Sequence, residues 1–331
     1  MKKSTYFFVI VTCLVCLTLF SSWGFLVHRT IHQLAVYELP EPMAPFFYAN
    51  MEKLVAEAGR PDTRRNTDST EASKHFIDLE PFGKNAAHDM PYSFTKAIKK
   101  YSKDSLLKYG YVPYHILYMK EKLTAAFRAK NKDSILFYAT DLAHYIGDAH
   151  VPLHTTENYD GQLTDQKGLH SLWESVIPEL LITEYNLYSA HKATYLKKPE
   201  LAIWTAIRQA HALLPDVLAQ EKAVSKQFTP ETKYRTQVRR GVEVKYYTTA
   251  FAKAYAVALN NTVNEQLLAS GDLIADFWYT SWIDAGKPDL SAITNWNDNL
   301  AKQYADEIHL YNRNELIKQK KLIAKKNNLL D

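Results

Sequence analysis

A stretch near the middle of the chain places four side chains that bind transition metals at helical spacing. His144 and Asp148 lie four residues apart, and His170 and Glu174 repeat that spacing. On a helix, residues four apart share one face with Cβ atoms about 5–6 Å apart, so each pair can converge on one ion. Imidazole and carboxylate ligands without thiolate suit zinc in hydrolytic sites. The spacing therefore predicts zinc-dependent hydrolysis.

Three further residues are candidate ligands because of where they stand in the sequence. Pro152 is expected to end the preceding helix and let His154 fold back toward the first pair. Asp62 and His75 stand in or beside predicted loops, where ligands are often presented. Taken singly, each has a simpler explanation, because buried histidines are usually hydrogen-bonded core residues and loop aspartates usually cap turns. The grouping of so many such residues favours a metal site.

Helical periodicity dominates residues 23–286, and no segment alternates as a strand does. Apolar residues in 134–146 recur three and four positions apart, which predicts a helix with one buried face. Similar helices are expected at residues 28–39, 43–58 and 114–129. Loops are expected at residues 59–62, 80–83 and 155–168, and a polar linker at residues 222–244. The predicted fold class is all-α, with a single multi-helix domain.

The overall composition is that of a globular protein. The 331 residues are 47% hydrophobic and 23% charged, which excludes wholesale disorder and a multi-span membrane protein. Glycine-rich nucleotide-binding motifs are absent from the sequence, which argues against nucleotide-dependent chemistry. Without residues 1–22 the chain has 38 basic and 36 acidic residues, a formal charge of +2. This balance gives no indication of a surface that coats a polyanion.

Residues 1–22 have the features of a secretory signal peptide. A basic start precedes an apolar run that is too short to cross a membrane comfortably as a helix. Both cysteines, Cys13 and Cys16, lie in this run, so the mature chain is expected to contain no disulfide. Cleavage is expected before Trp23. The mature protein is then expected to be exported, to the periplasm, the cell surface or the medium, and to be stabilised by its core, by metal ions or by both.

These residues together resemble the superfamily that joins zinc-dependent phospholipase C to the single-strand-specific zinc nucleases. Its members are all-helical phosphodiesterases with three zinc ions in a cleft, and the resemblance extends over residues 23–286. In that superfamily the mature chain begins with a tryptophan whose amino group and carbonyl bind zinc, and Trp23 stands at the predicted cleavage site. Residues 287–331 lie beyond the resemblance and are expected to form a peripheral C-terminal helical tail with a solvated, lysine-rich end.

The resemblance implies a set of ligands for each of the three zinc ions. The first ion is held by Asp62, His75, His144 and Asp148, the second by Trp23 and His28 with Asp148 as a bridge, and the third by His154, His170 and Glu174. It also implies an arginine against the phosphate, for which Arg65 is the match and Arg64 the alternative, with Asp62 as a proton acceptor. His32 and His150 are expected to be core residues or to support the ligands.

The resemblance leaves two substrate classes open. The short step from Trp23 to His28 is similar to the nucleases. The short loop before His170, and Glu174 in place of aspartate, are similar to the phospholipases. The nuclease-type Asp-x-Gly-Gly-Asn loop is absent, and Tyr159-Asp-Gly-Gln-Leu stands near its place. We therefore expect a phospholipase C-like enzyme acting on a phospholipid head group, with a single-strand-specific nuclease as the alternative, and in either case a monomer without an obligate protein partner.

Aromatic residues next to the ligands are candidates to line the substrate cleft. Phe76, Tyr145 and Tyr159 each stand beside a predicted ligand or its loop. Rings of this kind stack on nucleobases and also contact the choline cation, so they favour neither substrate class.

Two other kinds of function compete with catalysis. A binding module would keep zinc only for stability, but complete ligand sets for three ions argue against it, because a structural site is normally closed. A surface-interaction protein would act through the lysine-rich tail, and removal of residues 297–331 would then abolish its effect with the zinc sites intact.

Overall fold

The structure is a computed structural model that describes residues 25–239 and 242–326. Within this part of the chain helices provide nearly all the regular structure, as the all-α prediction requires, and the one sheet is a two-stranded hairpin. The predicted signal peptide and Trp23 lie outside the described residues. Among the helices that are described, none is both long enough and apolar enough to cross a lipid bilayer.

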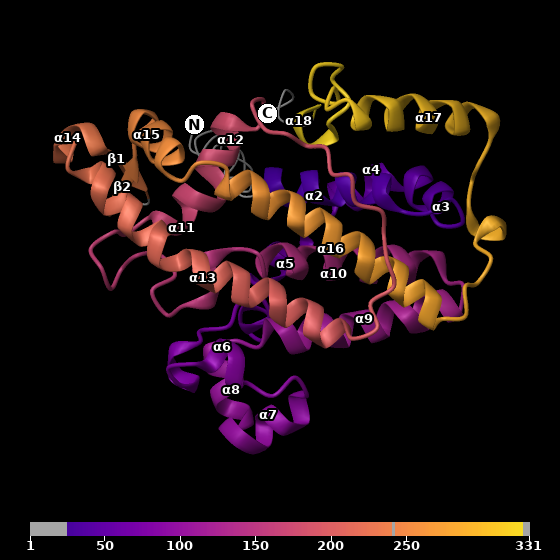
Figure 1. The fold of residues 1–331 in the computed structure, drawn as a ribbon, viewed down its shortest axis with the longest axis horizontal. Helices are drawn as coiled ribbons and strands as arrows, with labels where there is room; N and C mark the ends of the chain where they lie inside the picture. Colours follow the sequence, from indigo (N-terminus) through magenta and orange to yellow (C-terminus); the bar gives the residue numbers. More distant parts are fainter. Residues whose placement is uncertain (1–24, 240–241, 327–331) are drawn as a thin grey trace, which may run out of the picture.

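Four long helices form the centre of the described fold. They are α2 (Phe25–Glu38), α9 (Val112–Arg128), α10 (Lys132–Asp148) and α16 (Thr262–Asp284). Helix α16 packs against the other three, as Figure 1 shows. The Trp278 ring on α16 stacks on Phe47 at 4.7 Å, and its Nε1 donates a hydrogen bond to the carbonyl oxygen of Ala139 on α10. This apolar core holds the two helices, α2 and α10, that carry the predicted ligands His28, His144 and Asp148.

The long helices agree with the periodicity of the sequence. Helices α2, α9 and α10 correspond to the predictions at residues 28–39, 114–129 and 134–146. The predicted helix at residues 43–58 is divided into α3 (Ala44–Ala49) and α4 (Met51–Ala56), which meet at Asn50.

The prediction of a loop at residues 59–62 is wrong. A short helix, α5 (Arg60–Arg64), begins there with Pro61 in its first turn. Proline suits that position because its φ is already helical and its missing N–H would have no helical partner. Asp62 therefore lies on a helix, which fixes its direction more firmly than a loop would.

A second layer covers one end of the central helices. It contains α12 (Ile177–Leu181), α13 (Pro199–Ser225) and α15 (Thr249–Ala258). Helix α13 packs on α9, on α15 and on the 3-10 turn η3 (Pro152–Thr155), and it crosses the front of the view in Figure 1. A separate apolar core forms here around Trp173, Phe251 and Tyr255. The predicted ligands after residue 150 belong to segments of this second core, whereas His28, His144 and Asp148 lie on helices of the first.

The prediction of a polar linker at residues 222–244 is also wrong. Helix α13 continues through Ser225, α14 (Pro230–Lys233) follows, and β1 (Tyr234–Arg239) pairs antiparallel with β2 (Val242–Tyr247). Tyr234 lies opposite Tyr247, and these two residues at the base of the hairpin reach the second core. Farther out the described side chains are mostly exposed on both faces, so no apolar alternation marks the strands in the sequence.

The C-terminal tail lies on the outer side of α2 and α3, as Figure 1 shows. It contains η5 (Ser291–Ile293), α17 (Asp298–Asn312) and α18 (Ile323–Lys326). The fully buried Tyr311 donates its hydroxyl proton to Glu38 Oε1 at 3.0 Å. Gln33 on α2 donates to the Lys321 carbonyl oxygen at 2.8 Å and accepts from the Ile323 N–H at 2.8 Å. The tail is thus outermost in position, yet its side chains complete the burial of α2.

Short helices form a small lobe at the bottom of Figure 1. They are α6 (Ala86–Asp89), α7 (Phe94–Tyr101) and α8 (Lys103–Tyr109), preceded by the 3-10 turns η1 (Ala72–Lys74) and η2 (Glu80–Phe82). Helix α8 packs on η1 and α6 packs on α13. The lobe therefore supports the segment that leads to His75.

Candidate metal centre

Eight of the nine predicted ligands lie within the described residues, and the fold brings them together. They are His28 on α2, Asp62 on α5, His75 directly after η1, His144 and Asp148 on α10, His154 in η3, His170 in α11 (Leu169–Ser171) and Glu174 in the π-helical turn η4 (Leu172–Val176). Their side chains form three groups that are capable of holding a metal ion. The ninth predicted ligand, Trp23, lies outside the described residues.

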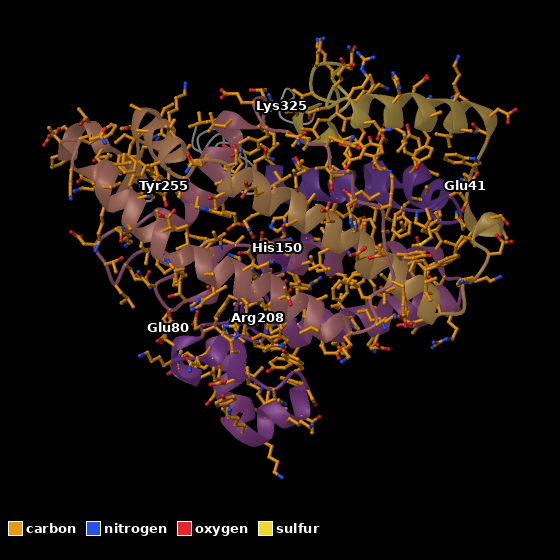
Figure 2. The ribbon with its side chains drawn as sticks, viewed as in Figure 1. Glu41, Glu80, His150, Arg208, Tyr255 and Lys325 are labelled. Atoms are coloured by element: carbon orange, nitrogen blue, oxygen red, sulfur yellow. The ribbon has the colours of Figure 1, made fainter. Side chains whose placement is uncertain are left out.

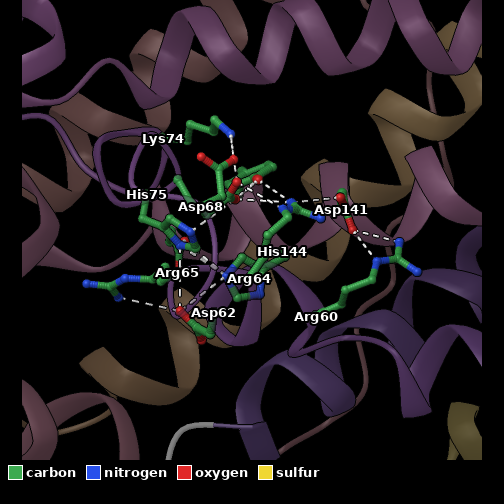
Figure 3. A network of polar contacts seen from close by, with 12 residues as sticks. Arg60, Asp62, Arg64, Arg65, Asp68, Lys74, His75, Asp141 and His144 are labelled. Carbon is green, nitrogen blue, oxygen red and sulfur yellow. Dashed lines mark hydrogen bonds and ion pairs between the residues drawn. The ribbon is translucent and has the colours of Figure 1, made fainter.

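The first group gathers four donor atoms from three segments. His75 Nδ1 lies 2.9 Å from Asp148 Oδ2 and 3.2 Å from His144 Nε2. Asp62 Oδ1 lies 3.7 Å from His75 Nδ1 and 3.8 Å from His144 Nε2, and Figure 3 shows these three side chains converging. Donors bound at 2.0–2.1 Å around a tetrahedral zinc ion are about 3.3 Å apart. The observed spacing fits one zinc ion.

The second group joins the two ends of the loop at residues 155–168. His170 Nε2 lies 2.8 Å from His154 Nε2 and 2.7 Å from Glu174 Oε2, and Glu174 Oε2 lies 3.5 Å from His154 Nε2. The four-residue step from His170 to Glu174 thus brings both onto one site, although the helix widens there into a π-turn, a form found often at functional sites. Three donors leave a fourth position open, as hydrolytic zinc sites do.

The third group joins His28 with His144 and Asp148, and Glu174 lies beside it. His28 Nε2 is 3.4 Å from Asp148 Oδ1 and 3.7 Å from Glu174 Oε1, and its ring stacks on His144 at 4.0 Å. Asp148 and Glu174 therefore each face His28 with one carboxylate oxygen and another group with the second oxygen. The resemblance implied such a bridge for Asp148, and the structure adds the same arrangement for Glu174.

The electrostatics of the site favour positive charge. Burial lowers the pKa of His28, but hydrogen bonds to Asp148 and Glu174 outweigh it and raise the pKa to about 10. Burial likewise lowers the pKa of His75, but the hydrogen bonds that its ring donates to Asp148 and Glu71 outweigh burial and raise the pKa to about 9. Despite its burial, the neighbouring histidines hold the pKa of Asp148 well below its usual range. A divalent cation supplies the charge that these groups attract, and its binding displaces their protons.

Backbone carbonyl groups orient two of the histidines. His144 Nδ1 donates to the Ala58 carbonyl oxygen at 2.9 Å, and His154 Nδ1 donates to the His75 carbonyl oxygen at 3.0 Å. A proton held on Nδ1 leaves the lone pair of Nε2 free, and Nε2 is the atom that faces the donor group in both residues. The local fold therefore presets the tautomer that a metal needs.

A buried glutamate, Glu71, supports His75 from behind. Its Oε1 lies 3.5 Å from His75 Nε2, and its carboxylate accepts hydrogen bonds from Arg64 Nε at 2.9 Å, from Lys74 Nζ at 2.6 Å and from the hydroxyl of Tyr145. Burial alone would raise the pKa of Glu71, but these partners hold the pKa far below its usual range. Glu71 is therefore a fixed negative charge next to a predicted ligand.

The same network joins α5 to α10. Arg64 also donates to Asp141 Oδ2 at 3.0 Å, and Arg60 donates to Asp141 Oδ1 at 2.7 Å (Figure 3). Sequence analysis did not identify Glu71 or Asp141. The available signal was the step from Glu71 to His75, which has the same four-residue spacing as the ligand pairs.

The two arginines considered for phosphate binding differ in their surroundings. Arg64 is bound to Glu71, Asp141 and Tyr145. The side chain of Arg65 is 47% exposed, and its Nη1 lies 3.6 Å from Asp62 Oδ1 at the edge of the first group. Arg65 is therefore accessible to a substrate, whereas the hydrogen bonds of Arg64 hold Glu71, Asp141 and Tyr145 together.

The exposed fraction of each side chain shows which of the aromatic residues expected in the substrate cleft are accessible to a substrate. Tyr145 is fully buried with its hydroxyl on Glu71, so the expectation that it lines a cleft is wrong. Tyr159 is 53% exposed, and its ring meets the ring of His170 edge-on at 6.3 Å. Tyr159 is thus an exposed ring beside the second group, while Phe76 is half-buried.

His32 and His150 are core residues. The ring nitrogens of His32 face the carbonyl oxygens of His28 and Thr140, and burial lowers the pKa of His32 to about 3. His150 hydrogen bonds to the Ile146 carbonyl oxygen at 2.8 Å and lies in the middle of the bundle just after α10 (Figure 2). Neither residue belongs to a donor group among the described residues.

Comparison with known proteins supports a single family. The S1/P1 nuclease family model matches residues 23–277, more than three quarters of the chain. No curated protein matches the chain. Zinc dependence and phosphodiester hydrolysis characterise this family, which is part of the superfamily that the sequence resembles. The chain therefore belongs to the S1/P1 nuclease family and is a zinc-dependent phosphodiester hydrolase of the all-α type.

Proposed function

We propose that this hydrolase is a nuclease that cleaves single-stranded nucleic acid with three zinc ions. The observation that carries the proposal is the family match over residues 23–277, which supports the nuclease alternative over the phospholipase C reading. Glu174 and the short loop before His170 had favoured the phospholipases. Glutamate adds one methylene to aspartate and keeps the same donor oxygens, so this exchange concerns metal binding more than substrate choice.

The three donor groups support three ions, with Asp148 and Glu174 shared between neighbouring groups. An ion next to His28 would take its remaining ligands from the amino group and carbonyl of Trp23, as the resemblance implies. One residue separates Trp23 from the start of α2 at Phe25, so the span of two residue steps is at most about 7 Å. His28 lies in the first turn of that helix, so a chain that begins at Trp23 can bring its terminus to the site.

When bound, zinc lowers the pKa of a water molecule and polarises the phosphate. The chain supplies the positioning. Asp62 has a side chain that is 33% exposed, and its free oxygen can accept the proton of the attacking water. Arg65 beside it neutralises a phosphate oxygen through charge-assisted hydrogen bonds. Tyr159 offers its exposed ring for stacking on a base of a single strand.

Export remains part of the proposal. Residues 1–22 have the pattern of a signal peptide, and the family match starts at residue 23, where cleavage is expected. Removal of the leader exposes the amino group of Trp23 that the ion next to His28 requires.

The test compares substrates on zinc-loaded mature protein that starts at Trp23. We expect cleavage of single-stranded DNA and RNA that a chelator abolishes, and no release of phosphocholine from phosphatidylcholine. Glu174→Gln should remove the activity with folding retained, whereas the matched exposed variant Glu52→Gln should behave as wild type. Release of phosphocholine without strand cleavage would reject the nuclease in favour of the phospholipase.

A further inference from the structure

The net charge of the chain is concentrated in one hairpin. Residues 233–247 contain five of the 40 basic residues and one of the 36 acidic residues. The rest of the chain has 35 of each kind, so the whole formal charge of +4 belongs to this segment. The near-neutral net charge of the whole chain therefore hides a local excess of positive charge, which attracts polyanions.

We call the described part of this segment, residues 233–239 and 242–247, the basic arm. Its base is firmly packed: the rings of Tyr234 and Tyr247 lie 5.0 Å apart, and Tyr247 packs on Phe251 at 4.8 Å. Lys233 Nζ forms an ion pair with the buried Glu221 at 2.8 Å. These contacts use the charge of Lys233 for anchoring and fix the direction of the arm.

Beyond the base the arm extends into solvent. Val238 is 70% exposed, and Arg235 and Lys245 are also exposed. Arg235 lies opposite Tyr246 in the strand register, with its guanidinium 5.9 Å from the centre of the Tyr246 ring. An isolated two-stranded hairpin is marginally stable and adds little to a core, so stability does not explain its arginine, lysine and tyrosine side chains.

The base of the arm contacts the loop that leads to the metal centre. The Tyr247 hydroxyl donates to the Gln166 carbonyl oxygen at 3.2 Å, and the Gln166 side chain donates to Glu221 at 2.6 Å. His170 follows this loop directly. From Tyr247 the strand reaches about 17 Å outward at 3.4 Å per residue. That length equals roughly five stacked nucleotides at 3.4 Å each.

We propose that the basic arm binds the sugar-phosphate backbone of a single-stranded substrate outside the metal centre. The proposal rests on the proposed nuclease activity. Arg235 and Lys245 contact phosphates, and the arginine-tyrosine pair provides the combination of cation and ring that strand-binding proteins use. Long strands then bind through the arm and the centre together, whereas a dinucleotide reaches the centre alone.

The test uses zinc-loaded mature protein with Arg235→Ala and Lys245→Ala combined. The control combines Lys302→Ala and Lys318→Ala, two exposed lysines of the tail that change the net charge equally. At low salt we expect about a tenfold higher KM for a 20-nucleotide strand. The slope of the logarithm of the binding constant against the logarithm of the salt concentration should also become shallower by about 1.4, because each phosphate contact to a single strand contributes about 0.7 to this slope. Cleavage of a dinucleotide should remain unchanged.

Two outcomes would overturn the arm as a strand-binding surface. One is an equal loss in the control variant or on the dinucleotide. The other is unchanged strand binding with lost binding to vesicles containing phosphatidylserine, which would assign the arm to a lipid surface. Fluorescence anisotropy of a labelled 20-nucleotide strand distinguishes failure of this proposal from failure of the nuclease proposal. Weaker strand binding by the arm variant supports strand binding by the basic arm even if no strand is cleaved.

Discussion

His75 Nδ1 lies 2.9 Å from Asp148 Oδ2, although 73 positions separate the two residues in the chain. The second oxygen of Asp148 lies 3.4 Å from His28 Nε2. One buried carboxylate thus joins two groups of donors that come from different ends of the central helices. Its removal affects both groups at once.

The first prediction concerns this shared carboxylate. Asp148→Asn should reduce the zinc content from three ions per chain to one, because two groups lose a negatively charged ligand. We expect hydrolysis to fall about a thousandfold, which corresponds to about 4 kcal/mol of transition-state stabilisation. Elemental analysis of the purified protein measures the zinc, and the exposed Asp133→Asn serves as the control. Three retained ions in Asp148→Asn would exclude the bridge.

The second prediction concerns the glutamate behind His75. Glu71→Gln removes the charge but keeps the shape, and we expect zinc affinity to fall about 10–100-fold, as for other outer partners of metal ligands. Competition with a chromophoric chelator measures the affinity, and circular dichroism checks the fold. Glu71→Asp should restore part of the affinity. An unchanged affinity in Glu71→Gln would limit Glu71 to holding Arg64 and Lys74 in place.

The third prediction concerns the start of the mature chain. Protein with extra residues before Trp23 should lose most of its activity, because its α-amino group no longer lies at the site. Specific proteolysis that restores Trp23 as the first residue should restore the activity. Full activity of the extended protein would refute the terminal ligand.

The fourth prediction concerns pH and a buried carboxyl group away from the metal centre. Burial and the neighbouring Asp272 raise the pKa of Glu38 to about 9, against the hydrogen bond from Tyr311 and the charge of Lys192. The folded chain therefore keeps this proton up to about pH 9, whereas the unfolded chain releases it near 4.5, the ordinary pKa of a glutamate side chain. The free energy of unfolding should fall as pH rises through this window.

Glu38→Gln removes this titration and retains a polar group for Tyr311. We expect the melting temperature of the wild type to fall more between pH 5 and pH 9 than that of Glu38→Gln. Thermal scans by circular dichroism across this range measure both. Parallel pH profiles of the two proteins would show that Glu38 does not keep a proton in the folded state.

The fifth prediction concerns the tail. Tyr311 is fully buried against Tyr37, with ring centroids 5.1 Å apart. By analogy with other large aromatic truncations, Tyr311→Ala should lower the free energy of unfolding by about 3–5 kcal/mol. Urea denaturation measures the loss, and Tyr118→Ala, at a residue 54% exposed, is the control. A loss no larger than that of Tyr118→Ala would make the tail dispensable for stability.

The sequence predicted those features that depend on residues only a few positions apart, namely the long helices and the pairs of donor side chains on one helical turn. His144 with Asp148, and His170 with Glu174, converge because a helical turn alone brings each pair together. His28, and the assignment of the candidates Asp62 and His75 to one ion, required the resemblance, because α2, α5 and α10 meet only through tertiary packing. The ligand roles themselves stay predictions until a metal is measured.

The features that sequence analysis missed depend on contacts between distant segments. Glu71 becomes significant only when Arg64 and Tyr145 surround it, and these residues stand 7 and 74 positions away in the chain. The hairpin lacks an apolar alternation because only its base is buried. The polar composition of the tail gave no sign that Leu316 and Leu322 enter the core.

The hydrogen bonds between Gln33 and the segment at residues 321–323 span 288 and 290 positions of the chain. The first described helix is thus completed by residues that are synthesised about 290 positions later. Contacts of such high sequence separation form late and slow the folding of a chain. A ribosome-bound or partly translocated chain therefore lacks the partner of Gln33, and α2 cannot reach its final burial until synthesis of the tail is complete. Completion of the burial of α2 is consequently a post-translational event.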